Sequence, residues 1–213
     1  MTKGLVLDFD GTLIEYENSW DVIREHFGLP RGLYRKMVLE QKMSEAQFRT
    51  VELSEWRRRS ISKVKLFELF KCLPIKPGAK TLLEKAKELG YKVAVVSQAP
   101  DFVLSIFYEE TGFRPDFEAS YQFHFDDEGL IEEVQFPYRD EKGFPSKVLA
   151  AKDFQRLIGV ESDDIVAVGD HYNDIELLKW AGLAIAVGPH HPSLLEVADR
   201  VVADDLSEIL QYL

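Results

Sequence analysis

A short apolar segment that ends in two closely spaced carboxylates constrains the fold of this chain more than any other feature. The segment from Gly4 to Leu7 has no polar side chain, as expected for a strand that is buried on both faces. Asp8 and Asp10 follow, and side chains at positions i and i+2 of an extended chain point to the same side. Two carboxylates held a few ångströms apart repel each other unless a cation or a shared proton compensates. The sequence therefore predicts such a site at the end of the first strand.

Three further motifs follow in order along the chain. The first motif, residues 8–12, reads D-x-D-G-T; a second apolar run ends at Ser97, Lys147 comes later, and a third run leads into Gly-Asp-His-Tyr-Asn-Asp at residues 169–174. With these four motifs in this order, the chain resembles the haloacid dehalogenase-like phosphohydrolases. The resemblance is closest to the phosphoserine phosphatase-like branch of that family.

The resemblance implies roles for the acidic residues. Asp8 would attack phosphorus and become an aspartyl-phosphate, while Asp10 would protonate the leaving alkoxide and later deprotonate the hydrolytic water. The expected cofactor is Mg²⁺, held by the Asp8 carboxylate, the Asp10 backbone carbonyl and Asp170. Mg²⁺ is expected because its usual ligands in proteins are one or two carboxylates together with phosphate oxygen and water. A carboxylate that attacks a phosphate dianion also needs a nearby cation to reduce the repulsion between the two negative charges.

The resemblance also implies a set of phosphate contacts. Lys147 would bridge the phosphate and the nucleophile. The Ser97 hydroxyl, the Gln98 amide and Asn173 would bind non-bridging phosphate oxygens. Asp174 would orient Lys147 or a metal-bound water.

The substrate is less well indicated. Glu17 matches the acid that contacts the substrate amino group in the phosphoserine phosphatase-like branch, although it is equally compatible with an exposed acid at a helix start. The arginine that reads the substrate carboxylate would fall near residues 50–53, which contain none, so Arg49 and Arg57 are the nearest candidates. Two departures also weaken the substrate assignment: Gln98-Ala99 stands where that branch usually has Gly-Gly, and His171-Tyr172 replaces a small pair.

Hydrophobic periodicity predicts an α/β fold in two parts. Residues 15–74 show helical spacing of apolar side chains and end in a proline cluster, Pro74-Ile75-Lys76-Pro77-Gly78. Residues 1–14 and 75–213 alternate strands and helices, which predicts a Rossmann-like parallel sheet with helices on both faces. We therefore expect an α/β core of residues 1–14 and 75–213 and a small all-helical cap of residues 15–74 inserted after the first strand. In such sheets, ligands bind at the carboxyl ends of the strands.

Particular elements are predicted as well. Pro30 is expected to open a helix, and Asp101 and Ser146 are expected to cap one each. The predicted helices of the core cover residues 79–89, 101–111 and 146–158, the strands cover residues 91–96, 165–168, 183–187 and 200–202, and an antiparallel hairpin pairs residues 117–125 with 130–136.

Composition limits the class of partner. The formal net charge of −11 argues against nucleic acid. No apolar run approaches the roughly 20 residues of a membrane span. The single cysteine, Cys72, excludes an internal disulfide and a cysteine-based zinc site and fits a reducing compartment. We therefore expect a cytoplasmic monomer or homodimer that acts on a small phosphorylated metabolite and binds neither nucleic acid nor membrane.

Charge is distributed unevenly along the chain. Residues 14–76 hold 13 Lys and Arg against 9 Asp and Glu, which is a net +4 in a chain of −11. This excess fits either solvated helix faces or a basic lid over an anionic substrate.

Three functions are compatible with the motifs. The leading hypothesis is a Mg²⁺-dependent phosphatase that hydrolyses a small phosphomonoester, with phosphoserine as the candidate substrate. A phosphotransferase or mutase would pass the same aspartyl-phosphate to an alcohol. A non-catalytic member of the family would only bind a phosphorylated ligand or a protein partner, but here every catalytic position is filled.

Overall fold

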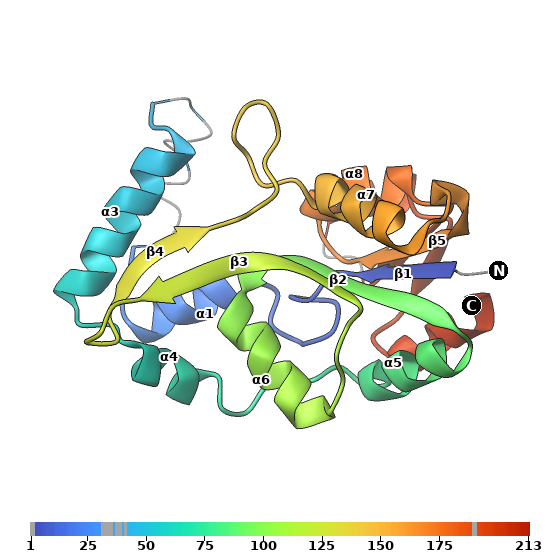
Figure 1. The fold of residues 1–213 in the computed structure, drawn as a ribbon, viewed down its shortest axis with the longest axis horizontal. Helices are drawn as coiled ribbons and strands as arrows, with labels where there is room; N and C mark the ends of the chain where they lie inside the picture. Colours follow the sequence, from blue (N-terminus) through green and yellow to red (C-terminus); the bar gives the residue numbers. More distant parts are fainter. Residues whose placement is uncertain (1–2, 31–35, 37–39, 41, 189–190) are drawn as a thin grey trace.

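The centre of the molecule is a mostly parallel β-sheet. The structure, a computed structural model, describes residues 3–30, 36, 40, 42–188 and 191–213. Within these residues the sheet has seven strands in the order β4-β3-β2-β1-β5-β6-β7, and only the β3–β4 pair is antiparallel (Figure 1). The strands are β1 (Lys3–Leu7), β2 (Tyr91–Pro100), β3 (Phe117–Phe125), β4 (Ile131–Gln135), β5 (Ile165–Gly169), β6 (Leu183–Val187) and β7 (Arg200–Val202).

Helices cover both faces of this sheet, because successive side chains of a strand point to opposite sides. Leu5 and Leu7 pack into one buried cluster with α5 and α6, whereas Val6 packs into a second cluster with α7 and α8. The predicted α/β fold with helices on both faces is therefore confirmed. The helices are α1 (Ser19–His26), α3 (Glu45–Arg58), α4 (Lys63–Leu69), α5 (Ala79–Glu88), α6 (Asp101–Thr111), α7 (Lys147–Ile158) and α8 (Ile175–Trp180), with 3₁₀ segments η1 (Ser162–Asp164), η2 (Tyr172–Asp174), η3 (Pro192–Glu196) and η4 (Leu206–Tyr212).

Two predicted helix caps are wrong in detail. Asp101 is the first residue inside α6, and its carboxylate accepts from the amides of Phe102 and Phe123, so it ties the helix start to β3. Ser146 does occupy the cap position of α7, but its side chain makes no capping hydrogen bond. The helix predicted after Pro30 lies largely outside the described residues.

Strand β2 is longer than the sequence predicts. It continues to Pro100, and its pairing with β3 shifts register between Val96 and Pro100. Such an irregularity bends a strand locally and can re-aim a side chain. Ser97, which the sequence places at the strand end, therefore lies inside this break in the ladder.

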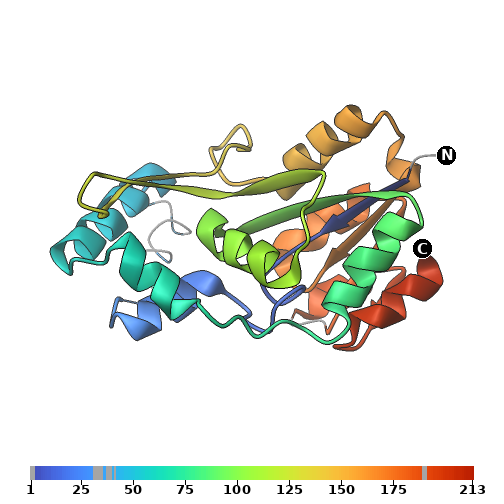
Figure 2. The same cartoon turned by 60° about the horizontal axis from the view of Figure 1, so that its bottom comes forward.

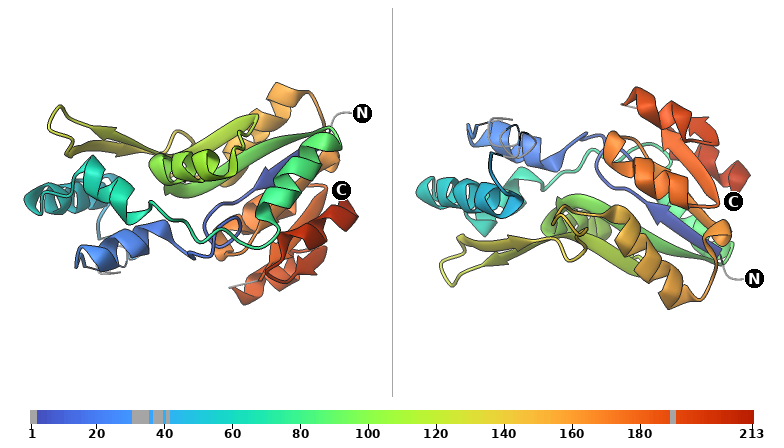
Figure 3. Two further views of the ribbon diagram at one scale, coloured as in Figure 1. Left: turned by 90° about the horizontal axis from the view of Figure 1, so that it is seen from below. Right: turned by 90° about the horizontal axis from the view of Figure 1, so that it is seen from above.

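Residues 15–74, called the insertion here, contain three of the described helices: α1, α3 and α4. They lie at one end of the molecule, away from both termini (Figures 2 and 3). The chain leaves and re-enters the core through two adjacent segments: the Glu15 amide donates to the Pro74 carbonyl at 2.8 Å, and the Lys76 amide to the Leu13 carbonyl at 3.0 Å.

The insertion also contacts the β3–β4 hairpin. Arg57 of α3 donates to the Ile131 carbonyl at 2.8 Å and pairs with Asp126 at 2.9 Å, and the Lys63 amide donates to the Gly129 carbonyl at 2.8 Å. The insertion is therefore attached at the hairpin as well as at its two chain connections. The division into core and cap stays a prediction.

Candidate active site

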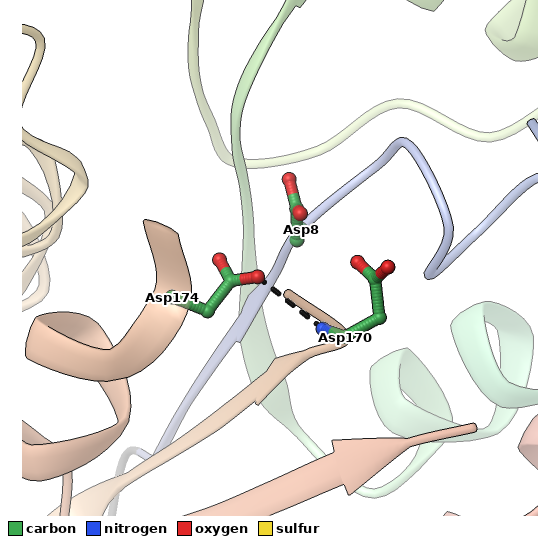
Figure 4. A group of neighbouring side chains, drawn as sticks. All are labelled: Asp8, Asp170 and Asp174. Carbon is green, nitrogen blue, oxygen red and sulfur yellow. Dashed lines mark hydrogen bonds between the residues drawn. The ribbon is translucent and has the colours of Figure 1, made fainter. Parts of the chain in front are cut away.

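Three carboxylates lie close together at the carboxyl ends of the central strands. Two of them follow strands, and the third belongs to a 3₁₀ turn. Strands β1 and β5 are neighbours, with Leu7 opposite Val168, so Asp8 and Asp170 leave the sheet side by side. Asp174 reaches back from η2, where its Oδ2 accepts from the amides of Asp170 and His171 at 3.2 Å each. Figure 4 shows the three side chains, which each offer an oxygen within 4.8 Å of the other two.

Two glycines make this convergence possible. Gly11 has φ +72°, and a Cβ there would lie 2.1 Å from Asp170 Oδ2. A Cβ on Gly169 would lie 2.4 Å from the Asp174 carboxyl carbon. Any larger side chain at either position would displace a carboxylate of the group.

One lysine holds two of the three carboxylates. Lys147, at the start of α7, is 3% exposed. Its Nζ lies 2.8 Å from Asp8 Oδ2 and 2.6 Å from Asp174 Oδ1. Burial alone would lower the pKa of Lys147, but the charges of Asp174 and Asp8 outweigh burial and raise it. The lysine is therefore a fixed cation.

The remaining negative charge is not balanced by the described side chains. Burial, followed by the charge of Asp8, raises the pKa of Asp170 to about 9 and that of Asp174 to about 7. Asp8 Oδ1 and Asn173 Oδ1 are buried and accept no hydrogen bond from the described part of the chain. Carboxylate and amide oxygens in a site with excess negative charge are the donor set for a hard divalent cation. The site therefore fits a divalent metal ion, with the Asp8 and Asp170 carboxylates as its first candidates.

Asp10 is close enough to Asp8 and Lys147 to interact with their charges, but its carboxylate is not one of the three in the cluster and is bound by the first helix of the insertion. Its carboxylate accepts two hydrogen bonds from Ser19, at the start of α1: from the amide at 2.7 Å and from the hydroxyl at 2.5 Å. Burial raises the pKa of Asp10 to about 7, against the opposing effect of the Ser19 bonds, and the charge of Asp8 adds to the rise. Ser19 was not predicted from the sequence as a contact of Asp10. The sequence signal that could have indicated it is a small hydroxyl residue at the start of the first inserted helix.

The predicted phosphate contacts lie on the neighbouring elements. Ser97 is buried in the break of β2, and its Oγ accepts from the Ala99 amide at 3.2 Å. The Gln98 carbonyl accepts from Trp20 Nε1 at 2.8 Å, so this segment contacts the insertion. Asn173 belongs to η2, directly before Asp174.

The two predicted substrate contacts differ in setting. Glu17 is exposed and lies just before Asn18, the N-cap of α1. Arg49 of α3 is largely buried: it pairs with Glu52 at 2.8 Å, donates to the Tyr121 hydroxyl at 3.0 Å, and lies 4.4 Å from the Trp20 ring. Arg57, the other arginine considered, is bound to the hairpin instead.

His171 and Tyr172, which stand where the phosphoserine phosphatase-like branch usually has a small pair, belong to a cluster of aromatic rings that follows Asp170. Their ring centroids lie 4.7 Å apart, and the His191 ring lies 5.8 Å from His171 and 5.9 Å from Tyr172. Tyr172 remains 43% exposed. The two residues that replace a small pair thus supply two of the three rings of this cluster, directly after Asp170 in the chain.

Comparisons with known proteins agree with this geometry. A family model described as haloacid dehalogenase-like hydrolase matches residues 5–179. The chain is 30% identical to a phosphoserine phosphatase of Methanocaldococcus jannaschii, over 99% of this chain and 97% of that protein. It is 29% identical to a 2-hydroxy-3-keto-5-methylthiopentenyl-1-phosphate phosphatase of Exiguobacterium sibiricum, over 85% and 82% of the two chains. A solved structure described as a phospho-aspartyl intermediate analogue of phosphoserine phosphatase superposes with a TM-score of 0.76, at 29% identity over 100% and 99% of the two chains.

Proposed function

The chain belongs to the haloacid dehalogenase-like hydrolases, and on that premise we propose that it hydrolyses a small phosphomonoester with Asp8 as the nucleophile. The observation that carries this proposal is the buried contact between Lys147 and Asp8, beside Asp170 and Asp174. Lys147 holds Oδ2 of Asp8, and Oδ1 accepts no hydrogen bond from the described residues. A carboxylate held in this way is oriented for attack, and the lysine lowers the repulsion that an incoming phosphate dianion meets.

The reaction proceeds in two displacements. The Asp8 carboxylate attacks phosphorus, the bond from phosphorus to the leaving oxygen breaks, and Asp10 gives its proton to that oxygen. Water then attacks the phosphorus of the aspartyl-phosphate, Asp10 takes a proton from the water, and Asp8 is released with inorganic phosphate. Asp10 suits both steps because its carboxyl pKa of about 7 allows either protonation state near neutral pH.

A bound divalent cation, which we propose is Mg²⁺, would neutralise charge on the phosphoryl oxygens. Asp8, Asp170 and the Asp10 backbone carbonyl would hold it. Ser97, the Gln98 amide, Asn173 and Lys147 would contact the phosphate, with Asp174 orienting Lys147. The predicted cytoplasmic location belongs to the same proposal.

The nucleophile can be tested with Asp8→Asn. The amide keeps the size of the carboxylate but cannot attack phosphorus, so kcat/KM should fall by about 1,000-fold or more while the thermal midpoint stays close to that of the parent. Asp127→Asn, an exposed hairpin-turn substitution, is the matched control and should retain full activity. A kcat/KM of Asp8→Asn within about tenfold of the parent contradicts the assignment.

We propose phosphoserine as the first substrate to assay, because the matching relatives that span the whole chain include phosphoserine phosphatases. The relative from Exiguobacterium sibiricum indicates a second class, a phosphorylated keto compound. A parallel assay of phosphoserine, sugar phosphates and keto-alkyl phosphates with Mg²⁺ distinguishes these classes. A kcat/KM for phosphoserine no higher than for the others contradicts the phosphoserine proposal without affecting Asp8.

Glu17 and Arg49 remain the proposed contacts to the leaving group. Glu17→Gln and Arg49→Ala should each lower kcat/KM on the best small substrate by about tenfold, roughly 1.4 kcal/mol, and spare an aryl phosphate that offers nothing to recognise. Because Arg49 also pairs with Glu52, its variant needs a thermal melt beside the assay. Equal losses on both substrates contradict a specificity role.

A further inference from the structure

The start of helix α1 contacts the reacting groups directly. Ser19, the first residue of α1, is fully buried. Its amide donates to Oδ2 of Asp10 at 2.7 Å and its hydroxyl donates to Oδ1 at 2.5 Å. Because two donors on one residue hold both carboxylate oxygens, rotation of the Asp10 carboxylate is restricted.

Ser19 is itself held from both sides. The preceding residue, Asn18, caps α1 by accepting from the Asp21 amide at 3.2 Å. The following residue, Trp20, donates from Nε1 to the Gln98 carbonyl at 2.8 Å and packs edge-to-face on Tyr121, with ring centroids 5.2 Å apart. The position of Ser19 is thus set by the insertion and by the segment that follows Ser97.

The Ser19 hydroxyl is not needed to form the helix. Asn18 already supplies the side-chain cap, and the first helical position makes no intrahelical amide bond. The hydroxyl instead makes a short, partly buried hydrogen bond to an acidic side chain, and hydrogen bonds to carboxylates are among the stronger ones in proteins.

We propose that Ser19 is a positioning residue that holds the Asp10 carboxylate in the orientation required for proton transfer to the leaving oxygen and from water. The proposal rests on the phosphatase function proposed above. It assigns to the inserted helix a part in the chemistry, because both donors to the Asp10 carboxylate found in the described part of the chain belong to α1. Misplacement of a catalytic group by about 1 Å is enough to slow a reaction by about 100-fold.

This role makes the effect of a Ser19 variant depend on the leaving group. An alkoxide is a poor leaving group and needs the proton of Asp10 as its bond to phosphorus breaks, whereas a dinitrophenolate leaves without one. The value of kcat/KM reports only the steps up to phosphorylation of Asp8. A loss of Asp10 positioning should therefore appear in kcat/KM for an alkyl phosphate and not for dinitrophenyl phosphate.

The test compares Ser19→Ala with Asn18→Ala on the best alkyl phosphate and on dinitrophenyl phosphate. Ser19→Ala should lower kcat/KM for the alkyl phosphate by about tenfold or more, and for dinitrophenyl phosphate by less than about threefold. Asn18→Ala removes the cap of α1 but keeps both Ser19 donors, so its loss of kcat/KM for the alkyl phosphate should be clearly smaller than that of Ser19→Ala. Ser19→Cys, which keeps the size but donates only weakly, should behave like Ser19→Ala and replaces it if the alanine variant folds poorly.

A double-mutant cycle tests whether Ser19 acts through Asp10. In an Asp10→Ala background, Ser19→Ala should change kcat/KM for the alkyl phosphate by less than about twofold, because there is no carboxylate left to position. Equal losses from Ser19→Ala on the two substrates, a loss from Asn18→Ala on the alkyl phosphate as large as that from Ser19→Ala, or a full additional loss in the Asp10→Ala background would each overturn the proposal. Failure of the phosphatase function is detected separately, by an Asp8→Asn variant that remains active.

Discussion

At the scale of residues, the site contains more buried negative charge than its lysine can balance. Lys147 contacts Asp8 and Asp174, while burial and the charge of Asp8 keep the pKa of Asp170 at about 9. The metal-free protein therefore binds protons at Asp170 and Asp174 at pH values where an unfolded chain has released them. Protons and a divalent cation are alternative ways to neutralise the same group of oxygens.

This competition predicts a pH-dependent effect of metal on stability. For a carboxyl whose folded pKa is raised, the stabilisation is complete below the unfolded value, near pH 4, and is lost as pH rises through about 7 for Asp174 and about 9 for Asp170. Metal binding strengthens over the same range because the ligands lose their protons. Saturating Mg²⁺ should therefore raise the thermal midpoint by roughly 5 °C or more near pH 8 and by much less near pH 5.

Thermal melts with Mg²⁺ and with EDTA at the two pH values measure this effect. Asp170→Asn should abolish most of the increase, whereas the exposed Asp127→Asn should leave it intact. A stabilisation by Mg²⁺ that is equal at both pH values, or larger near pH 5, contradicts the linkage.

At the scale of elements, the turn after β1 is the most sterically restricted part of the site. Gly11 and Gly129 have nearly the same φ, +72° and +74°, but only at Gly11 would a Cβ meet another group, Asp170. A substitution at Gly129 therefore measures the cost of backbone strain alone, whereas a substitution at Gly11 adds a steric clash with Asp170. An alanine at a positive φ costs about 1–2 kcal/mol wherever it occurs.

We therefore expect different outcomes for the two alanine variants. Gly129→Ala should lower the free energy of unfolding by about 1–2 kcal/mol and leave kcat/KM unchanged. Gly11→Ala should also displace Asp170, which lowers kcat/KM by about 100-fold or more and weakens Mg²⁺ binding. Denaturant melts, kinetics and metal titration of both variants test this. Activity of Gly11→Ala within about tenfold of the parent shows that the site tolerates a Cβ there.

At the scale of the whole molecule, the insertion and the core share one buried apolar cluster. Trp56 and Phe70 of the insertion belong to the same cluster as Leu5 and Leu7 of β1. The helices of the insertion lie at one end of the molecule, yet they are joined to the rest by side chains as well as by two chain connections. None of the helices in the described part of the chain is long and apolar enough to cross a membrane.

A shared cluster predicts a single cooperative unfolding transition. Calorimetry of the full chain should give one peak whose calorimetric and van't Hoff enthalpies agree. Trp56→Ala, at a fully buried position, should cost about 3–5 kcal/mol and move that whole peak to lower temperature by about 10 °C. Two resolved peaks, or a Trp56→Ala variant that splits the transition, would show that the insertion unfolds independently.

The sequence by itself determined the mostly parallel sheet, the order of its strands and helices along the chain, and the neighbouring positions of Asp8 and Asp170. Asp8, Ser97 and Asp170 each lie at or near the end of an apolar run, and a parallel sheet brings the carboxyl ends of its strands to one edge. This inference is local, because it needs only the type of residue that follows each strand. The cap at Asp101 was misjudged by one position, because Pro100 is the N-cap of α6 and the Asp101 carboxylate also accepts from an amide of β3, a contact that the local pattern does not predict. Ser146 occupies the predicted N-cap position, but its side chain makes no capping hydrogen bond.

Only the tertiary structure decided which side chains contact one another across these elements. The Asp10 carboxylate is bound by Ser19, nine residues later in the chain, because the packing of Trp20 against Gln98 and Tyr121 brings the start of α1 onto the site. Arg49 of the positively charged insertion is likewise engaged by Glu52 and Tyr121. Such contacts depend on how the inserted helix is placed relative to the carboxyl ends of the strands. The hydrophobic periodicity within either segment does not predict that placement. The local pattern therefore predicted which carboxylates follow the strand ends, and long-range packing set the contacts that those side chains make.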